Sequence, residues 1–128
     1  MNVGEIFEVT ILVTENDTAR AFGSGTLEVL ATPKMIALME MASYKSLEKY
    51  LENGQSSVGT YLDVKHVSAT PVGMKVTAKA EITVVDGRRV EFNVSAYDEK
   101  GLIGEGKHER FIVNDEKFVA KTYQKLEK

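Results

Sequence analysis

The chain has 128 residues, of which 43% are hydrophobic and 27% are charged, and its formal net charge is −3. These values predict a globular protein with a single domain, residues 1–128, and a real hydrophobic core. The basic residues are scattered rather than clustered, which argues against nucleic-acid binding. The chain contains no cysteine, which excludes disulfides, thiolate catalysis and cysteine-based metal sites.

The first residues, 1–5, lack the basic and apolar regions of a signal peptide. No apolar run along the chain has the length that a membrane-spanning helix requires. We therefore expect a cytoplasmic protein that does not insert into a membrane.

The predicted elements begin with a strand over residues 5–14, which is rich in β-branched residues and alternates in polarity. Turn and capping residues follow at 15–18. The glycines at 23 and 25, on either side of Ser24, predict a mobile or sharply bent segment that would serve as a lid or an entry loop.

Residues 33–52 predict the one long helix of the chain. Thr32 suits the N-cap, Pro33 suits the first helical position, and the Asn-Gly pair at 53–54 suits the end. The first half of this helix is apolar nearly all round, so we expect the rest of the fold to wrap it.

After this helix, the hydrophobic period changes to two. The short turns at 86–87 and 98–101 indicate antiparallel hairpins, and residues 115–128 predict a short helix or a tail. A strand, a wrapped helix and a four-stranded antiparallel meander make an α+β pattern, and a sheet curled around one helix is the hot-dog fold. A cystatin-like curved sheet is the competing interpretation. The four strands are predicted at 57–68, 75–85, 89–97 and 102–113.

Glu40 is the most informative residue, because it stands alone in an apolar run at 35–42. Burying an unpaired carboxylate is costly, so we expect Glu40 to be paired, hydrogen-bonded or protonated. A structural carboxylate with a nearby partner would satisfy the same requirement, and the pattern alone does not separate the two.

The chain has two histidines. Strand alternation puts His66 on one face of its strand, from which its imidazole could reach a helix lying across the sheet. His108 shares a face with Arg110, and we expect it to be a histidine on the sheet surface. Neither histidine has ligand spacing of a familiar metal site, so we predict no metal.

Taken together, Thr32, Glu40 and His66 supply a hydroxyl, a carboxylate and an imidazole. These are the groups needed to deliver water or a nucleophile to a carbonyl. Gly59 precedes His66 on the same strand, and its backbone N–H could remain open to a substrate carbonyl. Sequence spacing does not decide whether these groups converge.

Over most of its length the sequence resembles the hot-dog acyl-CoA thioesterases, in particular the fluoroacetyl-CoA thioesterase branch. The shared order and separation of several short motifs carry the resemblance. They are VLATP at 29–33, LME at 38–40, VGT at 58–60, VKHVSATPVG at 64–73, VDGRR at 85–89, IGEGKHER at 103–110 and EKFVAK at 116–121.

The resemblance implies a catalytic set of Thr32, Glu40 and His66, with Gly59 beside the substrate carbonyl and Arg110 near the site or in coenzyme A binding. It also implies an acyl-CoA substrate, no metal or other cofactor, and a homodimer, or a dimer of dimers, with sites at the subunit interface. We therefore expect an enzyme that hydrolyses a short or small acyl-CoA to the free acid and coenzyme A.

One segment departs from the branch that the chain resembles. The fluoroacetyl-specific enzyme carries phenylalanines on the lid before the helix, whereas Gly23 and Thr26 stand about there in this chain, with Phe22 out of register. We therefore expect thioester hydrolysis without strong selectivity for fluoroacetate. Two alternatives stay open: a hot-dog hydratase acting on enoyl thioesters, and a non-catalytic module that senses acyl-CoA.

Overall fold

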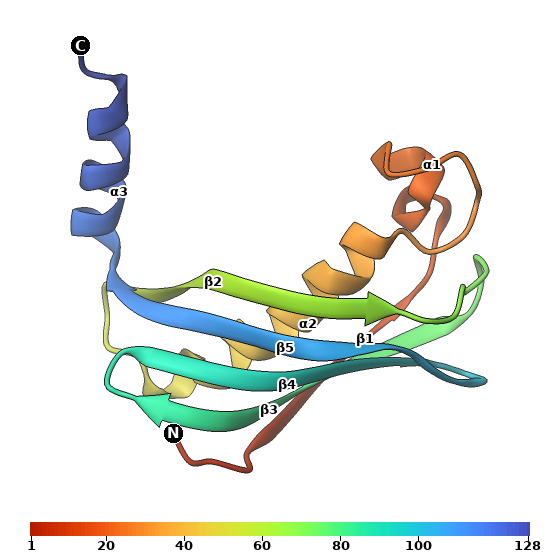
Figure 1. Ribbon diagram of the computed structural model, residues 1–128, viewed down its shortest axis with the longest axis horizontal. Helices are drawn as coiled ribbons and strands as arrows, with labels where there is room; N and C mark the ends of the chain where they lie inside the picture. The colour runs from red at the N-terminus through yellow and green to blue at the C-terminus, as the bar shows by residue number, and fades with distance from the viewer.

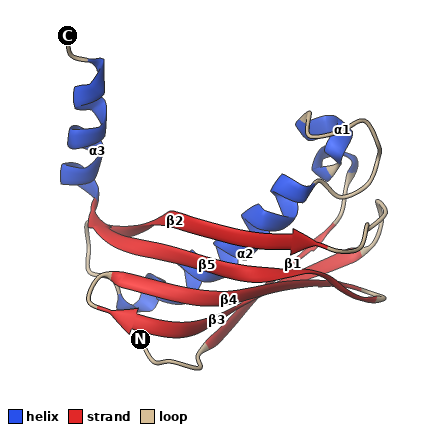
Figure 2. Ribbon diagram, viewed as in Figure 1, coloured by secondary structure: helices blue, strands red, loops and turns tan.

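The computed structural model describes residues 1–128 as one curved antiparallel sheet with a long helix lying against it (Figure 1). Figure 2 shows the helices, the strands and the loops that connect them. No helix combines the length and the apolar character that crossing a membrane requires. The strands are β1 (Ile6–Leu12), β2 (Gln55–His66), β3 (Lys75–Asp86), β4 (Arg89–Asp98) and β5 (Gly101–Asn114), and the α-helices are α1 (Ala19–Phe22), α2 (Thr32–Leu47) and α3 (Asp115–Tyr123). Single 3₁₀ turns cover Glu15–Asp17, Glu48–Tyr50 and Gln124–Leu126.

The strand order is β1-β3-β4-β5-β2. Hairpins join β3 to β4 and β4 to β5, as the short turns predicted. The predicted four-stranded meander is wrong, however, because β2 pairs with β5 and not with its neighbour in sequence, β3. The turn residues at 70–73 lie in a connection that carries the chain to the other side of the sheet. As a result, β2 is an edge strand with one side unpaired.

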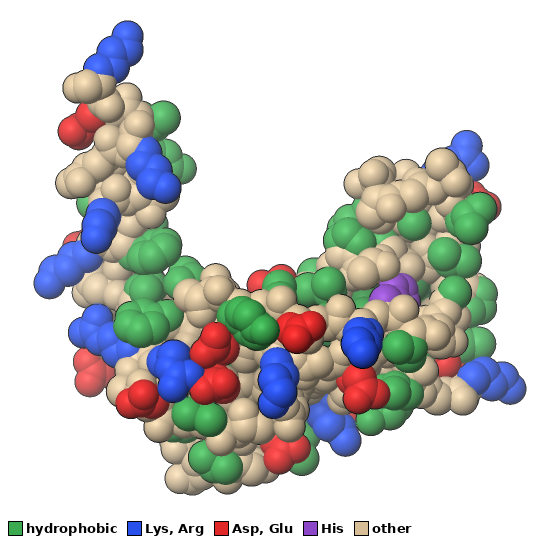
Figure 3. Space-filling view, in the orientation of Figure 1, with side chains coloured by type: hydrophobic (Ala, Val, Ile, Leu, Met, Phe, Trp, Pro, Cys, Tyr) green, Lys and Arg blue, Asp and Glu red, His purple; other side chains and the backbone are tan.

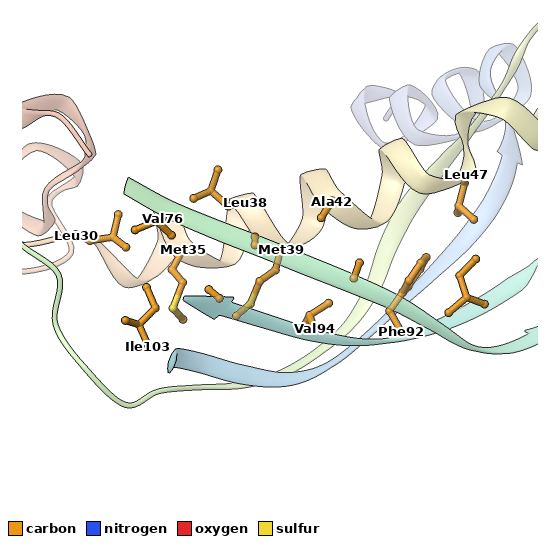
Figure 4. Packing of buried hydrophobic residues seen from close by; sticks show 14 of the residues in the cluster. Leu30, Met35, Leu38, Met39, Ala42, Leu47, Val76, Phe92, Val94 and Ile103 are labelled. Atoms are coloured by element: carbon orange, nitrogen blue, oxygen red, sulfur yellow. The ribbon is translucent and has the colours of Figure 1, made fainter. Parts of the chain in front are cut away.

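The core forms where the inward faces of the strands meet α2. Gly104 on β5 lets the helix approach closely, because a Cβ at this position would lie 2.6 Å from the sulfur of Met35. Figure 4 shows Met35 and Met39 of α2 directed towards the strands. The buried residues of α2 include Met35, Leu38, Met39, Ala42 and Leu47, and those of the strands include Val76, Ala78, Ala80, Ile82, Val90, Phe92, Val94, Ala96 and Ile103.

The start of α2 differs from the prediction. Ala31 occupies the N-cap and makes no side-chain cap, Thr32 is the first helical residue, and Pro33 follows within the first turn. The helix also ends at Leu47, and the 3₁₀ turn Glu48–Tyr50 takes its place to the C-terminal side. The hydroxyl of Thr32 is therefore free to bind a residue outside the helix.

Two helical segments, one at each end of the sheet, extend past the β2 edge. In Figure 1, α3 stands at one end and α1 at the other, and Figure 3 shows the hollow between them with hydrophobic side chains on both walls. Exposed hydrophobic residues lie in both ends: Phe22 and Leu27 near α1, and Phe118, Val119 and Tyr123 on α3.

Candidate active site

The first candidate cluster joins the start of α2 to the end of β2. The hydroxyl Oγ1 of Thr32 lies 2.7 Å from Nδ1 of His66, a hydrogen-bond distance. The other ring nitrogen of His66, Nε2, is buried and has no hydrogen-bond partner within the chain. A buried polar atom without a partner is unusual, so this imidazole has one position still to fill.

A pocket of about 300 Å³ opens beside this pair. Its walls come from α1, from the start of α2 and from the residues that follow β2, and Ser24 of the glycine-rich segment is among them. Gly23 ends α1 with a left-handed φ of 74°, which turns the chain toward this wall. The segment predicted as a lid or entry loop therefore borders the pocket that holds Thr32 and His66.

The electrostatics at the start of α2 favour a negative charge. The helix is 16 residues long, its first turn contains no acidic residue, and no side chain caps its free N–H groups. Unpaired N–H groups and the aligned peptide dipoles give such an end a partial positive charge. An oxyanion or a leaving thiolate would be stabilised there.

The second cluster lies about 12 Å further along α2, the rise of eight helical residues. Its carboxylate is Glu40, whose Oε2 lies 3.8 Å from Nη1 of Arg110. The Glu40 side chain is 38% exposed. The expectation of a paired acid is thus met, but the carboxylate is only half-buried, because the open β2 edge leaves one side of it uncovered.

Arg110 comes from the inward face of β5 and is almost fully buried. Its Nε donates to Oγ of Ser57 at 2.7 Å, and its Nη2 donates to the Ser57 carbonyl at 2.8 Å. The ring of Tyr44 lies 5.8 Å from the guanidinium carbon. Burial lowers the pKa of Arg110, an effect that the neighbouring Glu40 opposes. Arginine nevertheless remains charged in proteins, so Glu40 faces a fixed cation.

Gly59 lies opposite Arg110 in the pairing of β2 with β5, next to an irregularity in the register between Gly59 and Tyr61. A Cβ at this position would lie 3.2 Å from Oε2 of Glu40 and 3.2 Å from Cε1 of His108. Glycine therefore leaves the space beside the carboxylate open, and a β-bulge places backbone groups outside the regular ladder.

His108 is completely buried, so the expectation of a surface histidine is wrong. It does share its face with Arg110, as alternation predicted, and Nη1 of Arg110 lies 3.2 Å from its Nε2. The sequence contained a usable signal: residues 108, 110 and 112 share one face of a strand, and Ile112 marks that face as the buried one.

Of the residues predicted for the site, the structure brings Thr32 to His66, and Glu40 to Gly59 and Arg110. It does not bring the two groups together within one chain, because about two turns of α2 separate them. No three His, Asp or Glu side chains gather in an arrangement that could hold a metal ion.

Comparison with known proteins identifies the family. The model of the fluoroacetyl-CoA-specific thioesterase family matches residues 13–116. A fluoroacetyl-CoA thioesterase from Streptantibioticus cattleyicolor is 42% identical, over 98% of this chain and 94% of that protein. This chain belongs to the fluoroacetyl-CoA-specific thioesterase family. The resemblance and the enzyme class expected from the sequence are confirmed.

Solved structures of this family and its superfamily agree with the fold. A variant of the fluoroacetyl-CoA thioesterase in complex with acetyl-CoA matches with a TM-score of 0.93 and 41% identity, covering 98% of each chain. A thioesterase superfamily member from Thermus thermophilus matches with a TM-score of 0.87 and 32% identity, covering 98% of this chain and 92% of its own. The predicted α+β hot-dog fold is therefore confirmed.

Proposed function

We propose that this protein hydrolyses a small or short-chain acyl-CoA to the free acid and coenzyme A. Membership of a thioesterase family supports this, as does the acetyl-CoA bound to a variant of a relative. The observation that carries the proposal is the 2.7 Å contact between Thr32 and His66 beside a pocket at the positive end of α2. That arrangement offers a hydroxyl and an imidazole to a thioester, and the positive helix end would stabilise the negative charge that develops during its hydrolysis.

In the proposed reaction, Glu40 removes a proton from water as the water oxygen attacks the thioester carbonyl. Alternatively, Glu40 attacks the carbonyl itself, and water then hydrolyses the resulting anhydride to release the free acid and regenerate the carboxylate. The attack forms a tetrahedral oxyanion, and the C–S bond then breaks with its electrons on sulfur. His66 supplies the proton that the departing thiolate takes up, and Thr32 orients the imidazole or the water. A carboxylate and an imidazole in these roles are ordinary acid–base catalysts.

The oxyanion needs hydrogen-bond donors at the place where its charge develops. We assign this role to the backbone N–H of Gly59. The positive N-terminal end of α2 would further stabilise the negative charge of the oxyanion. Arg110 supports the site by facing Glu40 and holding it against the open space at Gly59.

The two clusters meet if the protein is a homodimer, which we also propose. The outer side of β2 is unpaired over the length of Gln55–His66, and an edge of this kind is a template for pairing with another strand. The hollow above this edge carries hydrophobic side chains on both walls (Figure 3), and Phe22 of α1 and Tyr123 of α3 are exposed. A second copy of the chain is the partner that such a self-complementary edge fits.

An antiparallel pairing of two β2 edges that is centred between residues 62 and 63 sets residue 66 of one strand opposite residue 59 of the other. His66 of one subunit then approaches the region of Gly59 and Glu40 in its partner. Each site would combine Thr32 and His66 from one subunit with Glu40 and Gly59 from the other.

Light scattering at micromolar protein concentration tests the assembly. We expect twice the chain mass of 14.2 kDa, and four times that mass would indicate a dimer of dimers. A stable monomer with full activity would remove the shared-site proposal.

A thiol-release assay over a panel of acyl-CoAs tests the activity. Free coenzyme A indicates a thioesterase, loss of the enoyl absorbance without thiol indicates a hydratase, and binding without turnover indicates a sensor. We expect thiol release, with the short acyl groups turned over fastest. We also expect the protein to act in the cytoplasm, which cell fractionation would test.

A further inference from the structure

His108 lies at the centre of a buried polar network that the proposed reaction does not use directly. It is fully buried on β5, and its ring stacks on Phe92 of β4 with centroids 6.1 Å apart and planes at 27°. Both nitrogens of a buried imidazole need hydrogen-bond partners. One nitrogen of His108 faces a carbonyl and the other faces a guanidinium, and this pair of partners fixes its protonation state.

The carbonyl oxygen of Tyr61 on β2 lies 2.9 Å from Nδ1 of His108. A carbonyl can only accept a hydrogen bond, so Nδ1 must carry a proton. On the other side of the ring, Nη1 of Arg110 lies 3.2 Å from Nε2. A guanidinium can only donate, so Nε2 must carry a lone pair. His108 is therefore a neutral imidazole with its proton on Nδ1.

The same contact helps to fix the orientation of Arg110. Ser57 takes the donors on Nε and Nη2, and His108 takes one donor on Nη1. The remaining N–H of Nη1 is on the side of Glu40, whose Oε2 lies 3.8 Å away. Because the guanidinium is planar, these contacts together fix its plane, and His108 supplies the acceptor that holds its Nη1 end beside Glu40.

We propose that His108 is a positioning residue for thioester hydrolysis, which holds Arg110 so that its guanidinium faces Glu40 across the open space at Gly59. A Cβ at Gly59 would lie within 3.2 Å of both the carboxylate and the imidazole, so the groups converge on one small space. The inference rests on the proposed function, because Glu40 is its target.

Protonation of His108 would undo this arrangement. The ring would lose its acceptor at Nε2 and would place a second positive charge against Arg110. The charged groups that face the ring are Arg110 and Glu109 on β5 and Glu40 on α2, while β2 contributes the Tyr61 carbonyl and β4 the Phe92 ring. Burial and Arg110 both disfavour the charged imidazole and outweigh the Tyr61 carbonyl and the carboxylates, so the pKa of His108 is lowered.

Two substitutions test the roles of the two ring nitrogens separately. In His108→Gln, the side-chain oxygen can replace Nε2 as the acceptor for Arg110. In His108→Asn, the shorter amide can still donate to the Tyr61 carbonyl but does not reach Arg110. We expect His108→Asn to lower kcat on the order of 10²-fold, the cost of a small misplacement of a reacting group. We expect KM to change by less than about threefold, and His108→Gln to recover most of kcat.

Equal losses in the two variants, a change in KM alone, or no loss in His108→Asn would overturn the proposal. Thiol release by the wild-type enzyme is the separate test of the proposed function, so the two failures are distinguishable. If neither variant folds, NMR of the wild-type imidazoles decides the matter. The chain has only two histidines, and we expect one to remain neutral with its proton on Nδ1 at neutral and mildly acidic pH. A charged ring or a proton on Nε2 at position 108 would contradict the inference.

Discussion

The two polar clusters along α2 differ in how far one chain completes them. At the start of the helix, His66 has one nitrogen bonded to Thr32 and the other buried without a partner. Further along, Arg110 and His108 have their polar atoms engaged within the chain, and Glu40 is held by Arg110. The polar atoms of the second cluster are paired within a single subunit, whereas the first cluster leaves the buried Nε2 of His66 without a partner. The difference agrees with our proposal that the complete site forms when two chains associate.

The largest expected effect is at the self-contained cluster. Glu40→Gln keeps the shape of the side chain but removes its basicity, so kcat should fall by roughly 10²–10⁴-fold while the protein remains folded. The measurement is kcat with the preferred acyl-CoA, together with a melting curve. Glu48→Gln, at the C-terminal end of the same helix, is the matched control.

Near-normal kcat in Glu40→Gln would show that this carboxylate is structural. If the variant instead turned over normally and melted much lower, the paired acid would serve the fold rather than the reaction.

The pocket beside Thr32 and His66 predicts weak selectivity between fluoroacetyl-CoA and acetyl-CoA. Its wall contains Ser24, between two glycines, and includes no phenylalanine, tyrosine or tryptophan that could close over a fluorinated acyl group. Discrimination between fluoroacetyl-CoA and acetyl-CoA by ordinary contacts should therefore be at most on the order of 10–200-fold. The measurement is the ratio of kcat/KM for the two substrates under one set of conditions. A preference of many thousand-fold would show that an aromatic lid is not needed.

A smaller effect is expected at Gly59, where the second cluster meets the open edge. In Gly59→Ala, the new methyl group would lie 3.2 Å from Oε2 of Glu40, closer than most real contacts, so the carboxylate must shift slightly. We expect kcat/KM to fall by about tenfold with little change in melting temperature. Ser56→Ala, on the exposed part of the same strand, is the control. An unchanged kcat/KM would show that the space beside the carboxylate is not part of the site.

The smallest effect concerns the stability of the self-contained cluster toward acid. Burial lowers the pKa of His108 in the folded state, so the unfolded chain binds a proton at a pH where the folded chain does not. Stability from this group is present above the ordinary histidine pKa and is lost as the pH falls toward the lowered one. Between about pH 7.5 and about pH 5.5, the melting temperature of the wild type should fall more than that of His108→Gln. Equal falls would show that His108 has no lowered pKa.

The sequence predicted the local elements well and the long-range pairings less well. The limits of β3, β4 and β5 lie within one residue of the prediction, because alternation and turn residues are local signals. The place of β2 beside β5 was missed, because the pattern of a strand does not state which neighbour it pairs with. His108 was missed for the same reason: in the polar run at 107–110 its burial depends on the helix above β5.

For the site, residue types and motif order predicted Thr32, Glu40 and His66 as the candidate catalytic residues. The distance between Glu40 and the other two was not. Eight residues along a helix separate two side chains by about 12 Å, whatever their chemistry. Only the structure shows that the imidazole lies beside the threonine of its own chain, while Glu40 lies further along α2 beside Arg110.

Activity in mixed dimers is the most direct test of the shared site. Glu40→Gln and His66→Asn are each expected to be nearly inactive alone. When the two variants are unfolded together and refolded as a mixture, half of the dimers pair an intact Glu40 with an intact His66 across one interface. Since each such dimer has one working site of two, the mixture should recover about a quarter of the wild-type activity. If the mixture stays as inactive as its components while mixed dimers are shown to form, the site lies within a single chain and the account is wrong.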